Sequence, residues 1–441
     1  MASSVKWRGI RAGVEPLRRM PMRTDVLPFR PAAWPAAVLL LGFAGFANAA
    51  TAEENWSRFR GPNGAGYAPG VQFPAAWTDD DYAWKIALPG KGHSSPVAWN
   101  ETLFITAGEE TTGELIVTSL RAQSGEELWT RRFPSKPHSM HPSNSYASST
   151  PAVDQRAVYV AWASPDSLQI AAISHDNQEL WRRDLGPIDS SHGFGVSPII
   201  VDDLVILAND NSGPSFVAAL DAATGQERWR RQRASGTPSF ATPAMLAAPD
   251  GSRQLIVCST AEGVAALSPA DGAPRWQLAK VFPVRCVGSP LVAGGLVVAA
   301  SGEGGNGKSF VAVRPPSAQG EAPSVAYELR KSLPQVPTPV AKDELLFVWS
   351  DRGVATCCRL LTGEVLWSER VGGNYFASPV IAGDKLYCVA ADGEVVALAA
   401  ADRYEVLGRT PLGEASQATP AVHRGRMYIR TERSLACLPE E

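Results

Sequence analysis

Four of the six histidines stand shortly before a proline that begins an apolar run. They are His93, His138, His141 and His192. Near pH 7 an imidazole can act as a general base, bind a metal ion or form hydrogen bonds. His138 and His141 have a spacing seen in metal sites, but no Asp, Glu or Cys nearby completes a ligand set. No Ser-His-Asp or Cys-His arrangement follows from the spacing either, so the sequence nominates no catalytic residue and no metal ligand.

Polar or aromatic residues stand at equivalent places before other prolines. They are Asn144, Tyr146, Arg285, Gln335, Asn374, Tyr375 and Gln417, with Ser239 and Phe240 in the same position of another repeat. Loops on a rigid scaffold are where binding residues concentrate. If these loops meet at one end of the molecule, they and the four histidines form a ligand-binding mouth. The alternative is that the same groups cap loop backbones and hold water.

An eightfold repeat sets the positions of these residues. A proline preceded by Ser or Thr and followed by an apolar strand recurs at Pro96, Pro151, Pro198, Pro243, Pro290, Pro339, Pro379 and Pro420. The intervals run from 40 residues, Pro339 to Pro379, to 55 residues, Pro96 to Pro151. Repeats of about this length build propeller blades. Most contain an apolar strand, a Gly turn and a Trp, most clearly over residues 216–229, and the seventh, around Asp402 to Leu407, has lost the Trp.

The two ends of the chain complete one repeat. The last repeat stops after a strand at 434–438, one strand short of a blade, while an unpaired strand at 82–88 opens the series. Pairing these ends removes exposed sheet edges. We therefore predict an all-β, eight-bladed β-propeller of four-stranded blades over residues 82–441, closed by the N-terminal strand. The repeated Trp is expected to pack between blades, with Tyr327 replacing it in the fifth.

The repeat resembles that of the pyrroloquinoline-quinone-like (PQQ-like) propeller proteins. Their signature, Ala-x-Asp-x-x-Thr-Gly-x-x-x-Trp, is matched by Ala219, Asp221, Thr224, Gly225 and Trp229. The resemblance covers Trp56 to the C-terminus and implies the same propeller. Relatives with this repeat include quinoprotein dehydrogenases, in which PQQ and calcium carry the redox chemistry, and the BamB-type outer-membrane assembly protein, which binds partners. The motif specifies the fold far more strongly than the function.

Residues 1–50 are predicted to be a secretory signal peptide. Arginines up to Arg30 precede an apolar run at 36–46 and the small-residue site at 47–49. The run is shorter than the ~20 residues that span a bilayer. We therefore expect export to the periplasm or cell envelope and no transmembrane segment in the mature chain, an uncleaved anchor being the alternative. Residues 51–81 are interpreted as a lead-in segment, and no Cys precedes Cys258 as the acylated residue of a lipoprotein would.

Other patterns are assigned to structure. The formal net charge is -3 with scattered Lys and Arg, which argues against a nucleic-acid partner. Residues 302–309 fit the Walker A pattern, but β-like residues 310–313 follow where a P-loop needs a helix, so we predict a strand-to-strand loop. Cys357 and Cys358 lie within a predicted strand, unlike the vicinal disulfide that the resemblance would place beside a quinone cofactor.

The preferred hypothesis is an exported, monomeric, non-catalytic propeller that binds an envelope protein, peptide or glycan without a cofactor. The alternative is a PQQ-dependent dehydrogenase that oxidises an alcohol or sugar, with PQQ and calcium as cofactors. For that reading no ordered set of Glu, Asn and Asp can be placed on the loops for calcium, and only Trp162 and Trp349 are nominated as a stacking floor. A hydrolase or lyase that uses the histidines is a third hypothesis, without a motif of its own.

Overall fold

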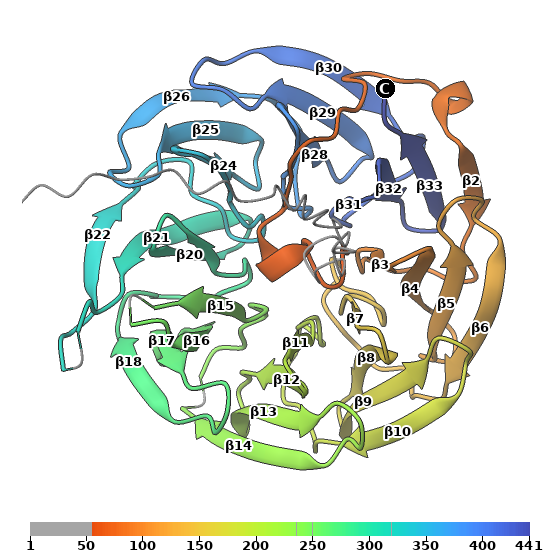
Figure 1. Ribbon diagram of the computed structural model, residues 1–441, viewed down its shortest axis with the longest axis horizontal. Coiled ribbons are helices and arrows are strands. Elements are labelled where there is room, and N and C mark those ends of the chain that lie inside the picture. Colours follow the sequence, from red (N-terminus) through yellow and green to blue (C-terminus); the bar gives the residue numbers. More distant parts are fainter. Residues whose placement is uncertain (1–54, 235, 249, 319) are drawn as a thin grey trace, which may run out of the picture. The chain divides into compact units, whose positions relative to one another are not determined.

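The repeated strands form eight sheets arranged around an axis, as the computed structural model shows (Figure 1). The structure describes residues 55–441 except residues 235, 249 and 319. It confirms the all-β, eight-bladed propeller. The predicted signal peptide, residues 1–50, lies outside the described residues. Within the described part of the chain, no helix has the length and apolar character that a membrane span requires.

Blades 1 to 4 are four-stranded antiparallel meanders. Blade 1 contains β3 (Val97–Trp99), β4 (Thr102–Gly108), β5 (Leu115–Arg121) and β6 (Glu127–Phe133). Blade 2 contains β7 (Ala152–Val153), β8 (Ala157–Ser164), β9 (Ser167–Ser174) and β10 (Glu179–Asp184). Blade 3 contains β11 (Ile199–Val201), β12 (Leu204–Asn209), β13 (Ser215–Asp221) and β14 (Glu227–Arg233). Blade 4 contains β15 (Ala244–Ala247), β16 (Arg253–Ser259), β17 (Gly263–Leu267) and β18 (Pro274–Leu278).

Blades 5 to 8 continue the series. Blade 5 contains β19 (Leu291–Ala293), β20 (Leu296–Glu303), β21 (Asn306–Arg314) and β22 (Ser324–Glu328). Blade 6 contains β23 (Val340–Lys342), β24 (Leu345–Trp349), β25 (Val354–Arg359) and β26 (Val365–Arg370). Blade 7 contains β27 (Val380–Ala382), β28 (Lys385–Val389), β29 (Glu394–Ala399) and β30 (Val406–Pro411). Blade 8 contains β31 (Ala421–His423), β32 (Arg426–Arg430), β33 (Ser434–Pro439) and the N-terminal strand β2 (Trp84–Ala87).

The N-terminal strand closes the ring as predicted. β2 pairs antiparallel with β33, with Trp84 opposite Cys437. The Trp84 indole then donates a hydrogen bond of 3.2 Å to the carbonyl oxygen of Ala122 in blade 1. The closing strand therefore completes blade 8 and also packs this blade against blade 1.

At three junctions the ring of the repeated Trp packs on a glycine turn of the next blade: Trp84 on Gly125, Trp181 on Gly225 and Trp229 on Gly272. The Trp181 indole donates to the carbonyl oxygen of Ala222 at 2.9 Å, and its ring lies so close to Gly225 that an added Cβ would stand 2.5 Å from a ring carbon. Gly225 also has a φ of 67°. Glycine is therefore required here by both space and backbone conformation. Tyr327 makes the equivalent bond to the carbonyl oxygen of Leu360 at 2.8 Å, as a replacement for Trp should.

The described part of the lead-in segment, residues 55–81, packs against the propeller blades. Its first turn, η2 (Pro62–Gly64), lies at the axis, and β1 (Tyr67–Ala68) adds a fifth, parallel strand to the inner edge of blade 7 (Figure 1). The segment then runs outward past Tyr387, whose hydroxyl donates to the carbonyl oxygen of Phe73, and through η3 (Asp79–Asp81) to β2. This path, coloured orange in Figure 1, was not predicted from the sequence.

Candidate functional site

A cavity of about 860 Å³ lies within the ring of loops that join neighbouring blades. Each of the eight loops contributes lining residues, and Phe59 of the lead-in segment lines it as well. The residues on either side of Phe59 are tied to the inner ends of the blades. Arg58 donates to the carbonyl oxygen of Pro243 at 2.6 Å, and Arg60 to those of Pro339 at 2.7 Å and Pro379 at 2.9 Å. The lead-in segment therefore closes the floor of the cavity.

Ser and Thr hydroxyls form the lowest tier of the cavity wall. In seven of the eight repeats, the residue before the proline receives a hydrogen bond from the backbone N–H of its counterpart in the preceding blade. These bonds run from Ser95 to Thr150, Thr150 to Ser197, Ser197 to Thr242, Thr242 to Ser289, Ser289 to Thr338, Thr338 to Ser378 and Ser378 to Thr419. Among the described residues no such bond joins Thr419 to Ser95. In these seven repeats the Ser or Thr before the proline therefore has a structural role, because its hydroxyl links neighbouring blades.

A second tier comes from the residue three positions before each repeat proline. Its members are His93, Ser148, Gly195, Phe240, Val287, Val336, Phe376 and Gln417, and all of them line the cavity. Residues two apart on an extended backbone point to the same side. The second tier therefore faces the same space as the hydroxyl tier, with a mixture of polar and apolar groups.

Two histidines and an arginine form a cluster nearer the mouth. The rings of His141 and His192 stack with centroids 5.1 Å apart, and Nη1 of Arg285 donates to Nε2 of His192. Burial lowers the pKa of His192, and the charges of Arg285 and His141 lower it further. His192 is therefore neutral at neutral pH, and a catalytic base would instead need a carboxylate in the place of Arg285.

His93 is a second neutral histidine on the wall. Burial lowers its pKa to about 3, with further contributions from Arg430 and Lys91. Its Nε2 atom is buried and has no hydrogen-bond partner among the described residues. His93 therefore presents an uncharged imidazole to the cavity across the physiological pH range.

The structure brings together seven of the eleven residues predicted for the mouth. His93, His141, Asn144, His192, Arg285, Gln335 and Gln417 line the cavity. The other four do not. His138 and Tyr146 contact each other instead, with the Tyr146 hydroxyl bonded to both the backbone N–H and the carbonyl oxygen of His138. This pair braces the long loop between blades 1 and 2.

Asn374 and Tyr375 precede the residues of their loop that face the cavity, so neither side chain lines the wall. Tyr375 is fully buried and packs edge-on against Trp349, with ring centroids 5.1 Å apart. Asn374 is exposed, and Phe376 lines the cavity in their place. Trp162 packs against Phe133 rather than lining the cavity, so neither nominated tryptophan forms the stacking floor.

Sequence reasoning missed Phe59, Phe376, Glu303 and the hydroxyl tier as cavity residues. Counting three residues back from each proline would have found Phe376. The Walker-like stretch does form a strand-to-strand loop as predicted, since Glu303 pairs with Asn306 across the β20–β21 hairpin. Its tip reaches the cavity, where the backbone N–H of Gly305 donates to Oε1 of Gln335 at 2.7 Å.

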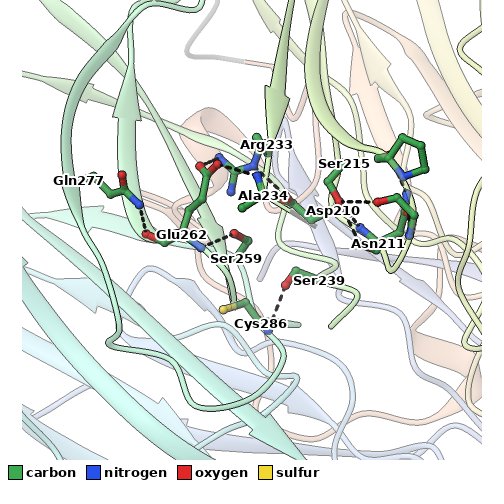
Figure 2. Close-up of polar contacts among 12 residues, drawn as sticks. Asp210, Asn211, Ser215, Arg233, Ala234, Ser239, Ser259, Glu262, Gln277 and Cys286 are labelled. Atoms are coloured by element: carbon green, nitrogen blue, oxygen red, sulfur yellow. Dashed lines mark hydrogen bonds and ion pairs between the residues drawn. The ribbon is translucent and has the colours of Figure 1, made fainter. Parts of the chain in front are cut away.

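A buried ionic cluster holds the loop that carries Phe240 (Figure 2). Nε of Arg233 lies 2.6 Å from Asp210, and Nη1 lies 3.1 Å from Glu262 of the next blade. The Arg233 side chain is completely buried. Burial alone lowers the pKa of Arg233, but the two carboxylates outweigh that effect and raise it. The backbone N–H of Ser239 donates to the carbonyl oxygen of Asp210, so this cluster also positions the loop against the wall.

Asp351 holds the loop between blades 5 and 6 and gives a test by pH. It accepts hydrogen bonds from the backbone N–H groups of Gln335 at 2.6 Å and Val336 at 3.2 Å, yet burial raises its pKa to about 6. Between about pH 4 and that value, the folded chain keeps a proton that the unfolded chain releases. The free energy of unfolding should therefore fall as pH rises, by at most about 1.4 kcal/mol per unit.

The Asp351→Asn variant isolates this contribution. Urea unfolding of both proteins between pH 4 and 6.5 should show that the wild type loses stability relative to the variant as pH rises. Parallel pH profiles would mean that Asp351 titrates at its ordinary pKa and is not controlled by burial.

The cavity lining does not fit a calcium site of the quinoprotein kind. Calcium binds six to eight oxygen ligands, usually including several carboxylates. Glu303 is the single carboxylate among the described residues that line the cavity. Within the described residues, no group of three or more His, Cys, Asp or Glu side chains is placed to hold a metal ion. Cys357 and Cys358 are buried in different core clusters on opposite faces of β25, away from the cavity.

Comparison with known families shows which protein family this chain belongs to. The family model described as outer membrane protein assembly factor BamB matches residues 113–324 and 324–438, more than half of the chain. The chain belongs to the BamB family. A BamB from Marinobacter adhaerens (strain DSM 23420 / HP15) is 29% identical over 107 residues, which are 24% of this chain and 27% of that protein. The match thus spans about a quarter of this relative's length.

Solved structures share the fold of this BamB-family chain. BamB from Moraxella catarrhalis aligns with a TM-score of 0.58 and 16% identity, over 81% of this chain and 99% of that one. The quinohemoprotein alcohol dehydrogenase from Comamonas testosteroni aligns with a TM-score of 0.63 and 12% identity, over 87% of this chain and 80% of that one. The BamB-like and quinoprotein-like likeness confirms the resemblance of the repeats, and at such identities it establishes the fold alone.

Proposed function

We propose that this BamB-family chain is an exported, non-catalytic propeller that binds a protein, peptide or glycan of the cell envelope at the mouth of its cavity. The observation that carries the proposal is the composition of the wall, in which all eight loops supply side chains around one cavity. Such a wall offers many weak contacts to a ligand. The relative's name, an outer membrane protein assembly factor, supports an envelope partner for this chain.

The histidine cluster supports binding over hydrolysis. A general base needs a pKa near the working pH and a group that favours its protonated form. The ring nitrogens of His192 contact Ser191 and Arg285, and the guanidinium disfavours a second positive charge. The pair of Ser191 and His192 therefore lacks the carboxylate that activates such a pair in hydrolases.

Site-specific photocrosslinking in the producing cell tests the proposal. A photoreactive residue at Ser143, on the cavity wall, should form adducts with a defined envelope component. The same residue at Thr362, in the exposed turn between β25 and β26, serves as the control. Adducts at neither position, or the same adducts at both, would contradict binding at the mouth.

The dehydrogenase alternative is tested with the purified protein. PQQ and calcium are titrated together while cofactor absorbance and a dye-linked oxidation of alcohols and sugars are followed. We expect neither saturable binding nor turnover, because the wall offers one carboxylate for the metal. Saturable binding with turnover would replace the scaffold proposal by a quinoprotein.

A further inference from the structure

The hydroxyl tier leaves hydrogen-bond donors directed at the cavity. Seven of its hydroxyls, from Thr150 round to Thr419, accept a backbone N–H, and none of them donates to another described residue. A hydroxyl has one proton and two acceptor lone pairs. Each of these hydroxyls therefore keeps its proton for a group inside the cavity, and the base of the cavity is rich in donors.

Two positive charges near the floor have no carboxylate partner among the described residues. Arg58 and Arg60 are 8% and 1% exposed, and both bond to carbonyl oxygens. Neither forms an ion pair with a described carboxylate. Burial lowers the pKa of each to about 9, so both remain protonated at neutral pH. A buried charge that is not neutralised is costly, and a nearby anion reduces that cost.

Arg285 adds an anchoring group nearer the mouth. Its one side-chain partner is the neutral His192, and its Nε is buried without a partner in the described part of the chain. Glu303, the carboxylate of the lining, is exposed and forms no ion pair with a described residue. The guanidinium fork matches the two oxygens of a carboxylate.

The closed floor limits how a ligand enters. Phe59 lines the cavity and its neighbours Arg58 and Arg60 are bonded to the blades, so we expect a polymer to enter by an end rather than to thread through. Above the donors, Phe240, Val287 and Phe376 give the wall an apolar band. The ligand should therefore combine an acceptor-rich, negatively charged tip with an apolar neighbour.

We propose that the cavity binds a carboxylate that stands beside an apolar or aromatic group, with the hydroxyl tier and Arg285 as its partners. The C-terminus of a polypeptide and a free small carboxylic acid both present this chemistry. The inference rests on the proposed function, and it specifies the chemical class of ligand that would bind at the mouth of the cavity.

Calorimetric titration tests the chemistry and separates the two sources. The probes are acetyl-Ala-Ala-Ala-Phe with a free C-terminus, the same peptide as the C-terminal amide, and 3-phenylpropionate. The free acid should bind at least tenfold more tightly than the amide. Tighter binding of the peptide acid than of phenylpropionate indicates a chain end, whereas equal binding indicates a small acid. Equal affinity of acid and amide, or no binding of either acid at millimolar concentration, would overturn the inference.

Two wall variants locate the carboxylate. Arg285→Gln removes the anchoring charge, and Gln417→Glu adds a negative charge to the second tier with little change in shape. Each should weaken binding of the acid at least tenfold, while the exposed Arg275→Gln variant binds as the wild type does. Thermal melting of all three variants is the check that each of them folds. Unchanged affinity in both wall variants would place the carboxylate elsewhere and refute this assignment.

The results separate this inference from the proposed function. Crosslinking at Ser143 without binding of either acid would remove the carboxylate inference and leave the envelope scaffold standing. Binding of phenylpropionate in a chain that crosslinks to nothing would keep the inference and replace the scaffold by a small-molecule binder.

Discussion

Replacing Arg60 by methionine should lower the free energy of unfolding by about 3 kcal/mol or more. Arg60 donates to the carbonyl oxygens of Thr338, Pro339 and Pro379, at 3.1, 2.7 and 2.9 Å. Each buried carbonyl left without a donor costs about 1–3 kcal/mol, whereas the loss of one buried charge offsets part of that total. The net effect should be unfavourable, because these bonds join the lead-in segment to blades 6 and 7.

Urea unfolding followed by tryptophan fluorescence measures this effect. Arg60→Lys is the matched control, since it keeps the charge but replaces the planar fork of donors with a compact ammonium group. It should fall between the wild type and Arg60→Met. A methionine variant within about 0.5 kcal/mol of the wild type would show that the lead-in segment contributes nothing through this residue.

Replacing Arg233 by methionine should lower the free energy of unfolding by about 3–5 kcal/mol, because removing one partner leaves buried charges uncompensated. Asp210 and Glu262 both contact the guanidinium, and the side chain of Asp210 is 7% exposed (Figure 2). Burial raises the pKa of Asp210 even with Arg233 present. Without the arginine this carboxyl should take up a proton more readily, so the loss should be largest above neutral pH.

A triple variant separates charge from shape. Adding Asp210→Asn and Glu262→Gln to Arg233→Met removes both carboxylates, so most of the lost stability should return. Chemical unfolding at pH 7 and pH 8.5 gives the comparison. If the triple variant is no more stable than Arg233→Met, the loss comes from packing rather than from unpaired charge.

The repeat made the architecture predictable, because each blade restates the same pattern. The Ser/Thr-Pro register gave the number of blades, and the unpaired strand at 82–88 gave the closure that β2 and β33 show. The exchange of Trp for Tyr327 was predicted as well, and the structure places its ring on the glycine turn at Gly363.

The lead-in segment was beyond local sequence reasoning. Arg58 and Arg60 bond to residues 185 and 319 positions away, and no nearby pattern marks such partners. The sequence predicted which loops form the candidate site but not in every case which side chain of a loop faces the cavity. The type of residue near each proline suggested the mouth, but the direction of each side chain depends on its register. Tyr375 faces the core, while Phe376, one residue later, faces the cavity.

The closure by β2 has a consequence for how the chain folds. Trp84 pairs with Cys437, so 353 residues separate the two partners of the closing contact. An N-terminal strand that waits for the last three strands must stay unpaired until almost the whole polypeptide is present. Contacts this distant in sequence form slowly because of the entropy of loop closure. Ring closure should therefore be a late step, during which the edges of β2 and β33 are exposed to aggregation.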